Sequence, residues 1–243
     1  MKIDAAKKYI PLAALVLLGA LLIFTVCMRA GAEEPKASET PQPTPTENTK
    51  PEESEEPENG LPAAKTESWE LLLANKSHSI SEYAPEELSE VDSVKVDSRI
   101  VAALTAFKEA AEAEGYTMHI CSGYRDYQTQ RSLYNNKVAE YGVTKGSAIV
   151  APPGTSEHQT GLACDIADGY YQYLSPSLEN TELFQWMYAH CQEYGFILRY
   201  PKDKVNETGF VYEPWHFRYV GTEAATYIME NNLCLEEFLA LYE

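Results

Sequence analysis

The chain has 243 residues, of which 44% are hydrophobic and 23% charged, with 19 basic side chains against 37 acidic ones. This length allows one compact domain of roughly 150–200 residues with additional segments, and the hydrophobic fraction excludes a wholly disordered protein. The formal net charge of −18 argues against a nucleic-acid-binding protein, because the phosphate backbone requires a basic surface.

The N-terminus has the pattern of a membrane anchor. Residues 10–28 are nineteen consecutive uncharged, mostly apolar positions, and about 20 such residues span a bilayer as a helix. Lys7 and Lys8 precede this run, which predicts a cytoplasmic N-terminus and an extracellular remainder of the chain. We therefore predict a signal anchor over residues 1–32. The alternative is a signal peptide cleaved near Ala32, which would give a secreted protein.

Residues 33–66 are predicted to form a disordered, acidic, Pro- and Glu-rich linker. Within this stretch, residues 33–62 contain nine glutamates and seven prolines but a single leucine, Leu61. Such a composition cannot bury enough apolar surface to offset the entropy lost on ordering. We expect an extended tether between the membrane and the rest of the chain.

Residues 67–243 have the aliphatic and aromatic density of a folded domain. A helical pattern of apolar residues follows Asp97, a typical N-cap, and similar patterns begin at Thr181 and Thr222. The predicted helices span 97–115, 126–141, 181–194, 222–231 and 235–241. The predicted strands span 69–74, 117–121, 163–167, 196–200 and 216–220. Because no regular βαβ alternation is present, we predict an α+β fold in which helices flank a small antiparallel sheet.

Two short segments hold residue types that bind a catalytic metal. Residues 156–165 read SEHQTGLACD and residues 213–218 read EPWHFR, which offers His158, Asp165, His216 and Glu213. A catalytic zinc site has three N or O protein ligands and a water molecule that a nearby carboxylate can deprotonate. A lone histidine is more often structural, and each carboxylate alone could be a capping or surface group. The paired occurrence favours a site that hydrolyses amide bonds.

The two segments resemble the VanY-type zinc D-alanyl-D-alanine carboxypeptidases, in a group that includes lysostaphin-like enzymes and the hedgehog signalling domain. The shared patterns are S-x-H-x-x-G-x-A-x-D over 156–165 and E-x-W-H-x-R over 213–218. Three further segments fit: 71–76 resembles the family's first strand, 122–130 its substrate-binding segment and 194–200 a core strand. The resemblance covers about residues 69–240 and implies a zinc carboxypeptidase domain over residues 67–243.

The resemblance also implies roles for the reacting groups. His158, Asp165 and His216 would bind zinc (Zn²⁺), the expected cofactor. Glu213 would be the general base and then the acid that protonates the leaving amine. Arg125 would stabilise the carbonyl oxygen as it becomes an oxyanion.

For the substrate, the resemblance implies that Ser156 and Gln130 hold its terminal residue and carboxylate. Trp215 either lines the substrate cleft or packs beside the metal, and we interpret Arg218 as a residue that orders a neighbouring carboxylate. Three other histidines match no ligand position and are interpreted as structural or surface residues: His78, His119 and His190.

The resemblance predicts removal of the C-terminal D-alanine from peptidoglycan stem peptides, with D,D- or L,D-specificity, during wall maturation in a bacterial envelope. The protein would act as a membrane-anchored monomer. Two alternatives remain, namely a peptidoglycan endopeptidase and a non-catalytic zinc module that binds cell wall or protein. Retention of Glu213 and Arg125 disfavours the binding module, which needs neither residue.

The cysteines outside the anchor are even in number. Cys121, Cys164, Cys191 and Cys234 allow three disulfide pairings in an exported domain, and free buried thiols are an equal alternative. Alternation along the predicted strand would point Cys164 away from the metal.

Overall fold

The computed structural model describes residues 61–63, 66–169 and 174–243, all of which belong to one compact unit, Glu52–Glu243. The predicted anchor over 10–28 and nearly all of the predicted linker lie outside the described residues. Among the described residues, no helix combines the length and the apolar character needed to cross a bilayer. The membrane anchor therefore stays a prediction.

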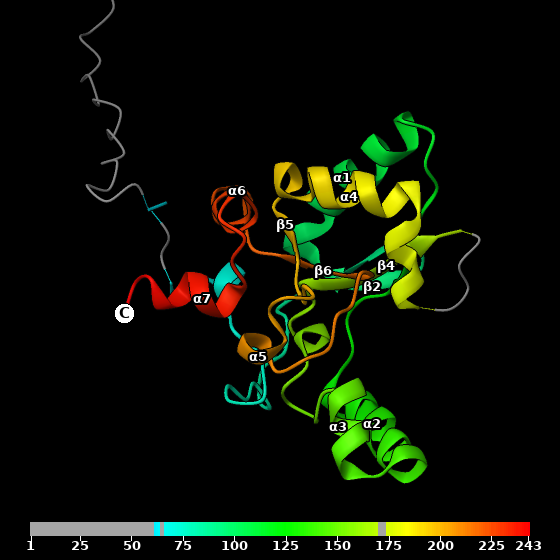
Figure 1. Ribbon diagram of the computed structural model, residues 1–243, viewed down its shortest axis with the longest axis vertical. Helices are drawn as coiled ribbons and strands as arrows, with labels where there is room; N and C mark the ends of the chain where they lie inside the picture. The colour runs from blue at the N-terminus through cyan, green and yellow to red at the C-terminus, as the bar shows by residue number, and fades with distance from the viewer. Residues whose placement is uncertain (1–60, 64–65, 170–173) are drawn as a thin grey trace, which may run out of the picture. The chain divides into compact units, whose positions relative to one another are not determined.

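A four-stranded antiparallel sheet forms the centre of the unit (Figure 1). Its strand order is β3-β4-β6-β5, and every neighbouring pair is antiparallel. The strands are β3 (Met118–Ser122), β4 (Ala163–Asp168), β5 (Phe196–Leu198) and β6 (His216–Tyr219). The mixed fold with a small antiparallel sheet and four of the five predicted strands are thereby confirmed.

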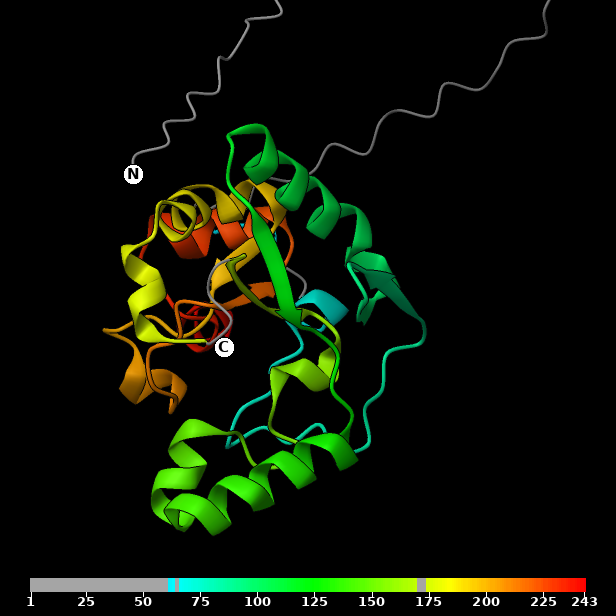
Figure 2. The same cartoon turned by 90° about the vertical axis from the view of Figure 1, so that its right-hand side faces the viewer.

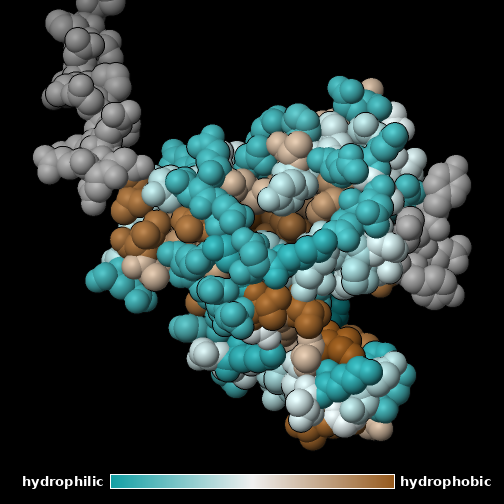
Figure 3. Space-filling model, viewed as in Figure 1, coloured by the Kyte–Doolittle hydropathy of each residue, from teal (hydrophilic) through white to brown (hydrophobic). Residues whose placement is uncertain are grey.

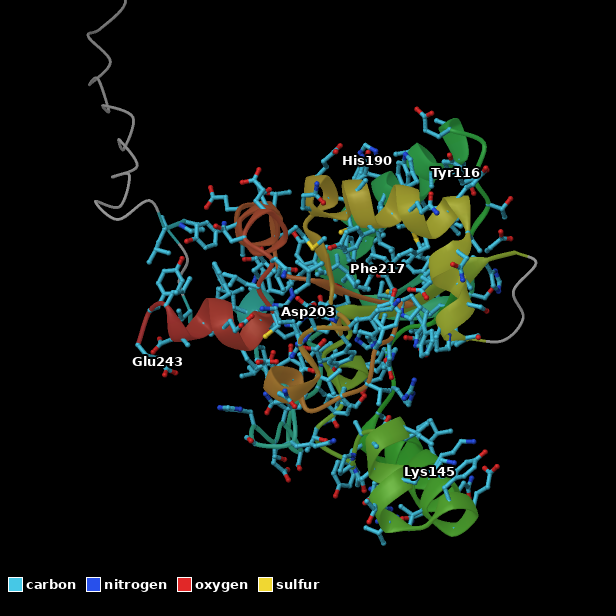
Figure 4. The ribbon with its side chains drawn as sticks, in the orientation of Figure 1. Tyr116, Lys145, His190, Asp203, Phe217 and Glu243 are labelled. Carbon is cyan, nitrogen blue, oxygen red and sulfur yellow. The ribbon has the colours of Figure 1, made fainter. Side chains whose placement is uncertain are left out.

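One face of this sheet carries the main hydrophobic core. The helices α1 (Val101–Ala113) and α4 (Glu182–His190) cover that face, as Figures 1 and 2 show. Phe107 of α1 is fully buried and stacks on Phe196 of β5 with ring centroids 5.6 Å apart. Phe217 of β6 lies in the same core, in the middle of the unit (Figure 4). Apolar residues at helical spacing on α1 and α4 thus meet alternate strand residues.

The opposite face packs on a second, smaller core. The helices α6 (Thr222–Glu230) and α7 (Leu235–Ala240) supply most of it, and Ile197 of β5 contacts it from the sheet. Because side chains alternate along a strand, Asp165 and His216 lie on this second face, whereas Cys164 and Phe217 point into the main core. The expectation that Cys164 faces away from the ligands is confirmed.

A pair of helices stands beside the sheet. Figure 2 shows α2 (Tyr127–Tyr141) and α3 (Val143–Ile149) side by side at one end of the unit. Gly146 allows this contact, because a Cβ atom there would lie 3.0 Å from the backbone of Val138. The side chain of Asp126 caps α2 by accepting a hydrogen bond from the backbone N–H of Thr129. Hydrophobic side chains gather where the pair meets the rest of the unit (Figure 3).

The predicted strand over 69–74, the family's expected first strand, is wrong. Residues Trp69–Leu71 form a 3₁₀ helix, and the segment after it pairs with no strand of the described chain. Its buried residues Leu71 and Ala74 still face the interior. Apolar character alone did not distinguish a covered loop from a strand.

Several elements were not predicted. The strands β1 (Leu88–Val91) and β2 (Val94–Asp97) form a separate hairpin before α1. The short helices α3 and α5 (Val205–Thr208) were also missed. Asp97 acts as a cap, as predicted, but it caps the 3₁₀ turn Ser98–Ile100 that leads into α1. The predicted helix over 181–194 is α4 followed by a 3₁₀ turn, Cys191–Tyr194.

Candidate active site

The three predicted ligands meet at one point on the second face of the sheet. Asp165 of β4 pairs directly with His216 of β6, and His158 comes from the 3₁₀ turn Glu157–Thr160 that precedes β4. Asp165 Oδ2 lies 3.4 Å from His158 Nε2, and Asp165 Oδ1 lies 3.2 Å from His216 Nδ1. With zinc–ligand distances of about 2.0–2.1 Å, two ligand atoms of a tetrahedral site are about 3.3 Å apart. The geometry fits zinc.

The chemical types of the three ligand side chains also fit zinc. All three residues are buried, and their candidate ligand atoms lie within 4.8 Å of one another. Asp165 Oδ1 has no hydrogen-bond partner among the described residues, although it is buried. A buried carboxylate oxygen without a partner is costly unless it binds a cation. Two imidazoles and one carboxylate are common ligands of catalytic zinc.

His158 is oriented by the backbone of the segment that carries Arg125. Its Nδ1 lies 2.7 Å from the carbonyl oxygen of Gly123, so Nδ1–H donates there and Nε2 is left for the metal. The backbone N–H of Arg125 donates in turn to the carbonyl of His158 at 3.0 Å. Only glycine fits at position 123, because a Cβ atom would lie 2.4 Å from the carbonyl oxygen of Lys95.

The charges of the site act on one another. Burial opposes ionisation of Asp165, but the adjacent His158 and His216 outweigh it and hold the pKa of Asp165 well below its usual range. Burial also disfavours a charged His216, yet Asp165 and Glu157 raise the pKa of this imidazole to about 9. A metal ion must therefore displace a proton from His216.

Glu213 lies beside the ligands and is not one of them. The backbone N–H of His216 donates to the carbonyl of Glu213 at 3.1 Å, which closes a turn that brings the two side chains together. Glu213 Oε2 lies 3.7 Å from His216 Nδ1. Burial, helped by the charge of Asp165, raises the pKa of Glu213 to about 7. A carboxylate with such a pKa is suited to take up and return a proton at neutral pH.

Arg125 reaches the cleft from the loop between β3 and α2. Its Nη1 donates to Gln130 Oε1 at 2.7 Å and its Nη2 donates to Ser122 Oγ at 3.2 Å. Burial lowers the pKa of Arg125, while the nearby Asp165 and Glu213 oppose that shift. An arginine stays charged under such a shift, so Arg125 places a cation in the same cleft as the metal ligands.

A cleft of about 250 Å³ joins these groups. All eight predicted site residues line it: Arg125, Gln130, Ser156, His158, Asp165, Glu213, Trp215 and His216. Its apolar wall includes Leu133 of α2, Ile149 of α3 and Phe210. Trp215 lines the cleft, one of its two predicted positions, and also packs against the main core.

Glu157 is an important residue that the motif did not identify. Its carboxylate is wholly buried and accepts hydrogen bonds from Arg199 Nε at 2.7 Å and Arg218 Nη1 at 2.8 Å. Burial disfavours its ionisation, but the two guanidinium groups hold the pKa of Glu157 well below its usual range. Arg218 thus orders a carboxylate, as interpreted from the sequence. A signal was present in the sequence, since an acidic residue adjoins a candidate ligand and two arginines occur in predicted strands.

The four domain cysteines are all free thiols. Cys164, Cys191 and Cys234 are buried, whereas Cys121 is exposed. Burial raises the pKa of the Cys191 thiol to about 12. None of the four belongs to the ligand cluster. Of the alternatives left open by the sequence, the structure contains the unpaired thiols.

Comparison with known proteins places this site in a family. The sequence profile of the family described as VanY, D-alanyl-D-alanine carboxypeptidase, matches residues 93–222. A D-alanyl-D-alanine carboxypeptidase of Enterococcus faecalis is 41% identical over 197 residues, which cover 75% of this chain and 71% of that protein.

Two solved structures are similar in both sequence and fold. A mutant of the vancomycin-resistance D,D-pentapeptidase VanY, crystallised with Zn(II), is 38% identical with a TM-score of 0.64, over 71% of this chain and 99% of the other. The LD-carboxypeptidase LdcB is 36% identical with a TM-score of 0.66, over 75% of this chain and 91% of the other. Together with the cluster of His158, Asp165 and His216, these matches show that the chain belongs to the VanY family of D-alanyl-D-alanine carboxypeptidases.

Proposed function

We propose that this protein is a zinc-dependent carboxypeptidase that removes the C-terminal D-alanine from peptidoglycan stem peptides. The observation that carries the proposal is one cleft in which three zinc-type ligands adjoin Glu213 and Arg125. The names of the relatives support the substrate class, since they include both D,D- and L,D-carboxypeptidases. Both kinds release the same residue, D-alanine.

Each side chain of the site has a separate role in the proposed reaction. Zinc held by His158, Asp165 and His216 would supply Lewis-acid activation of water and of the scissile carbonyl. Glu213 accepts the proton of the attacking water and passes it to the leaving amine of D-alanine. The guanidinium of Arg125 lies where it can stabilise the negative charge that develops on the carbonyl oxygen. No covalent bond to the enzyme is formed.

The remaining cleft residues bind the departing residue. Ser156 offers a hydroxyl, and Gln130 offers an amide next to Arg125. Trp215 and the apolar wall would contact the methyl group and the preceding residue of the peptide. Ser156 and Gln130 would hold the free carboxylate at the end of a peptide, which favours an exopeptidase over an endopeptidase.

Defined muropeptides test the proposal. Purified protein is incubated with a stem pentapeptide and a stem tetrapeptide, with and without a zinc chelator, and products are identified by mass spectrometry. We expect free D-alanine from at least one peptide and none after chelation. Release of larger fragments from cross-linked peptides would indicate an endopeptidase. Zinc binding without any cleavage would indicate the non-catalytic module.

We also propose that the enzyme is anchored in the cell membrane through residues 10–28, with the catalytic domain outside the cell. The support is the uncharged run behind Lys7 and Lys8, followed by the acidic linker. A protease added to intact cells should release the domain by cutting within 33–62. A mature protein that begins near Ala32 would instead indicate a secreted enzyme.

The proposal includes a monomer, because the cleft of a single chain already combines the three ligands with Glu213 and Arg125. Light scattering coupled to gel filtration measures this directly. A dimer as the active species would contradict it.

A further inference from the structure

We propose that Glu157 is a positioning residue for the zinc ligand His216, because its carboxylate fixes the far side of the imidazole ring and so presents Nδ1 to the metal. The inference rests on the zinc site of the proposed function and is independent of the substrate. Neither the motif nor the ligand cluster includes Glu157.

Two buried atoms without hydrogen-bond partners face each other at this point. Both hydrogen bonds to the carboxylate, from Arg199 and Arg218, end on Oε1. Glu157 Oε2 and His216 Nε2 are buried and have no hydrogen-bond partner within the described part of the chain. They lie 3.5 Å apart, so a shift of a few tenths of an ångström gives a charge-assisted hydrogen bond.

The other contacts of the His216 ring do not determine which of its nitrogens carries the proton, whereas Glu157 can. Its Nδ1 faces Asp165 and Glu213, which lie on the metal side. Tyr200 and His158 contact the ring through ring–ring packing, with centroids 4.8 and 4.9 Å away. Packing limits the tilt of an imidazole but does not choose its tautomer. A carboxylate beside Nε2 does determine the tautomer. It accepts a hydrogen bond from Nε2–H, so the proton stays on Nε2 and the lone pair of Nδ1 is left for zinc.

The two histidine ligands therefore differ in their supports. His158 is held by the neutral carbonyl of Gly123, whereas His216 is held by an ionised carboxylate. A carboxylate partner makes an imidazole a more basic ligand than a carbonyl partner does. His216 should thus form the stronger zinc bond of the two, although the two rings belong to the same site.

The carboxylate is itself held rigidly. Arg199 uses Nη1 and Nη2 to bind Glu236 of α7 at 2.8 and 2.7 Å, and Arg218 Nη2 donates to the carbonyls of Glu70 and Leu72, both at 2.9 Å. Each guanidinium therefore joins Glu157 to a separate part of the chain. A support fixed from two sides can define the direction of a metal ligand, which a mobile surface carboxylate cannot do.

The test measures zinc affinity, not turnover. Glu157→Gln keeps the shape of the side chain but removes the negative charge of the group that accepts the hydrogen bond from His216 Nε2–H. The dissociation constant for zinc is measured by competition with a chelator of known affinity. We expect it to rise by about 10–100-fold, the usual effect of losing such a support.

Two further variants separate positioning from general damage. Glu237→Gln removes a carboxylate of the same helix, α7, that pairs with Lys204 and not with Arg199, so its zinc affinity should equal that of the wild type. Glu157→Asp keeps a charge for the arginines and draws it back from His216, so its zinc affinity should fall even if Glu157→Gln fails to fold. Circular dichroism monitors the fold of each variant.

The outcomes are distinct. Weaker zinc binding in the Glu157 variants together with normal binding in Glu237→Gln supports the inference. Normal binding in the folded Glu157 variants, or an equal loss in Glu237→Gln, overturns it. A wild-type protein that binds no zinc overturns the proposed function itself.

Discussion

Gln130 accepts a 2.7 Å hydrogen bond from Nη1 of Arg125, and its own amide nitrogen donates to the carbonyl of Ala151 at 2.7 Å. Gln130 is also the buried residue of α2. Its side chain therefore joins the helical pair to the arginine of the active site. The resemblance implied contact with substrate, and the structure adds that Gln130 orients Arg125.

Arg125→Lys should lower kcat/KM for D-alanine release by about 10²–10³-fold, the cost of losing one oxyanion donor. A lysine carries the charge but lacks the planar fork that bonds Gln130 and Ser122 at once. Steady-state kinetics on a stem peptide measures the effect. Arg131→Lys, at an exposed position of α2, is the matched control and should behave as wild type. A fully active Arg125→Lys would remove Arg125 from the mechanism.

Glu213→Gln should leave zinc bound and the fold intact while lowering kcat by about 10²–10⁴-fold, because it removes the proton acceptor and no ligand. Zinc content by mass spectrometry and kcat are measured on the same sample. The exposed Glu207→Gln is the control. Loss of zinc from Glu213→Gln would show that this residue is a ligand.

Asp165→Asn should abolish the stabilisation that zinc gives to the protein. A ligand that binds only the native state adds about 2.7 kcal/mol to the free energy of unfolding at a concentration of 100 times its Kd. Zinc should therefore raise the Tm of the wild type and not that of Asp165→Asn. An equal rise in both proteins would place the metal elsewhere.

Glu236 should make the stability of the domain sensitive to acid. Burial opposes its ionisation, but Arg199 outweighs burial and lowers the pKa of Glu236 in the folded state. A carboxyl with a depressed folded pKa stabilises the protein above its unfolded pKa of about 4.3, and this contribution is lost as the pH falls through the folded value. Urea titrations between pH 7 and pH 3 should give a flatter profile for Glu236→Gln than for the surface control Glu230→Gln. Identical profiles would contradict the role of this pair.

The strands that carry the site could be predicted from the sequence, because each is a short run of apolar residues that is visible without knowledge of the tertiary fold. Asp97 and Thr181 form side-chain caps as predicted, and Asp126, the first residue of the predicted helix over 126–141, caps α2. The β1–β2 hairpin was not predicted, because its turn is formed by Asp92 and Ser93. These residues have φ of 51° and 72°, whereas the usual sequence signal for such a turn is Asn-Gly or Asp-Gly. The false strand over 69–74 has a different cause. The carbonyls of Glu70 and Leu72 are satisfied by Arg218 and not by a neighbouring strand.

The candidate site was predicted through motif positions, but of its supports only Arg218 was predicted, as a residue that orders a neighbouring carboxylate. Glu157 occupies an unspecified (x) position of the pattern, and its partners Arg199 and Arg218 lie 42 and 61 residues further along the chain. Such a buried network depends on the tertiary fold. The sequence shows an acidic residue beside a ligand and two arginines in predicted strands, but periodicity and local spacing do not show that these three groups meet.

The direct pairing of Asp165 with His216 across β4 and β6 has a consequence for folding. A slip of one residue between these strands would turn His216 toward the main core and separate the two ligands. The ion can therefore bind only a chain whose central strands are correctly aligned. Zinc uptake during refolding should report strand alignment, and a collapsed chain with misaligned strands would stay without metal.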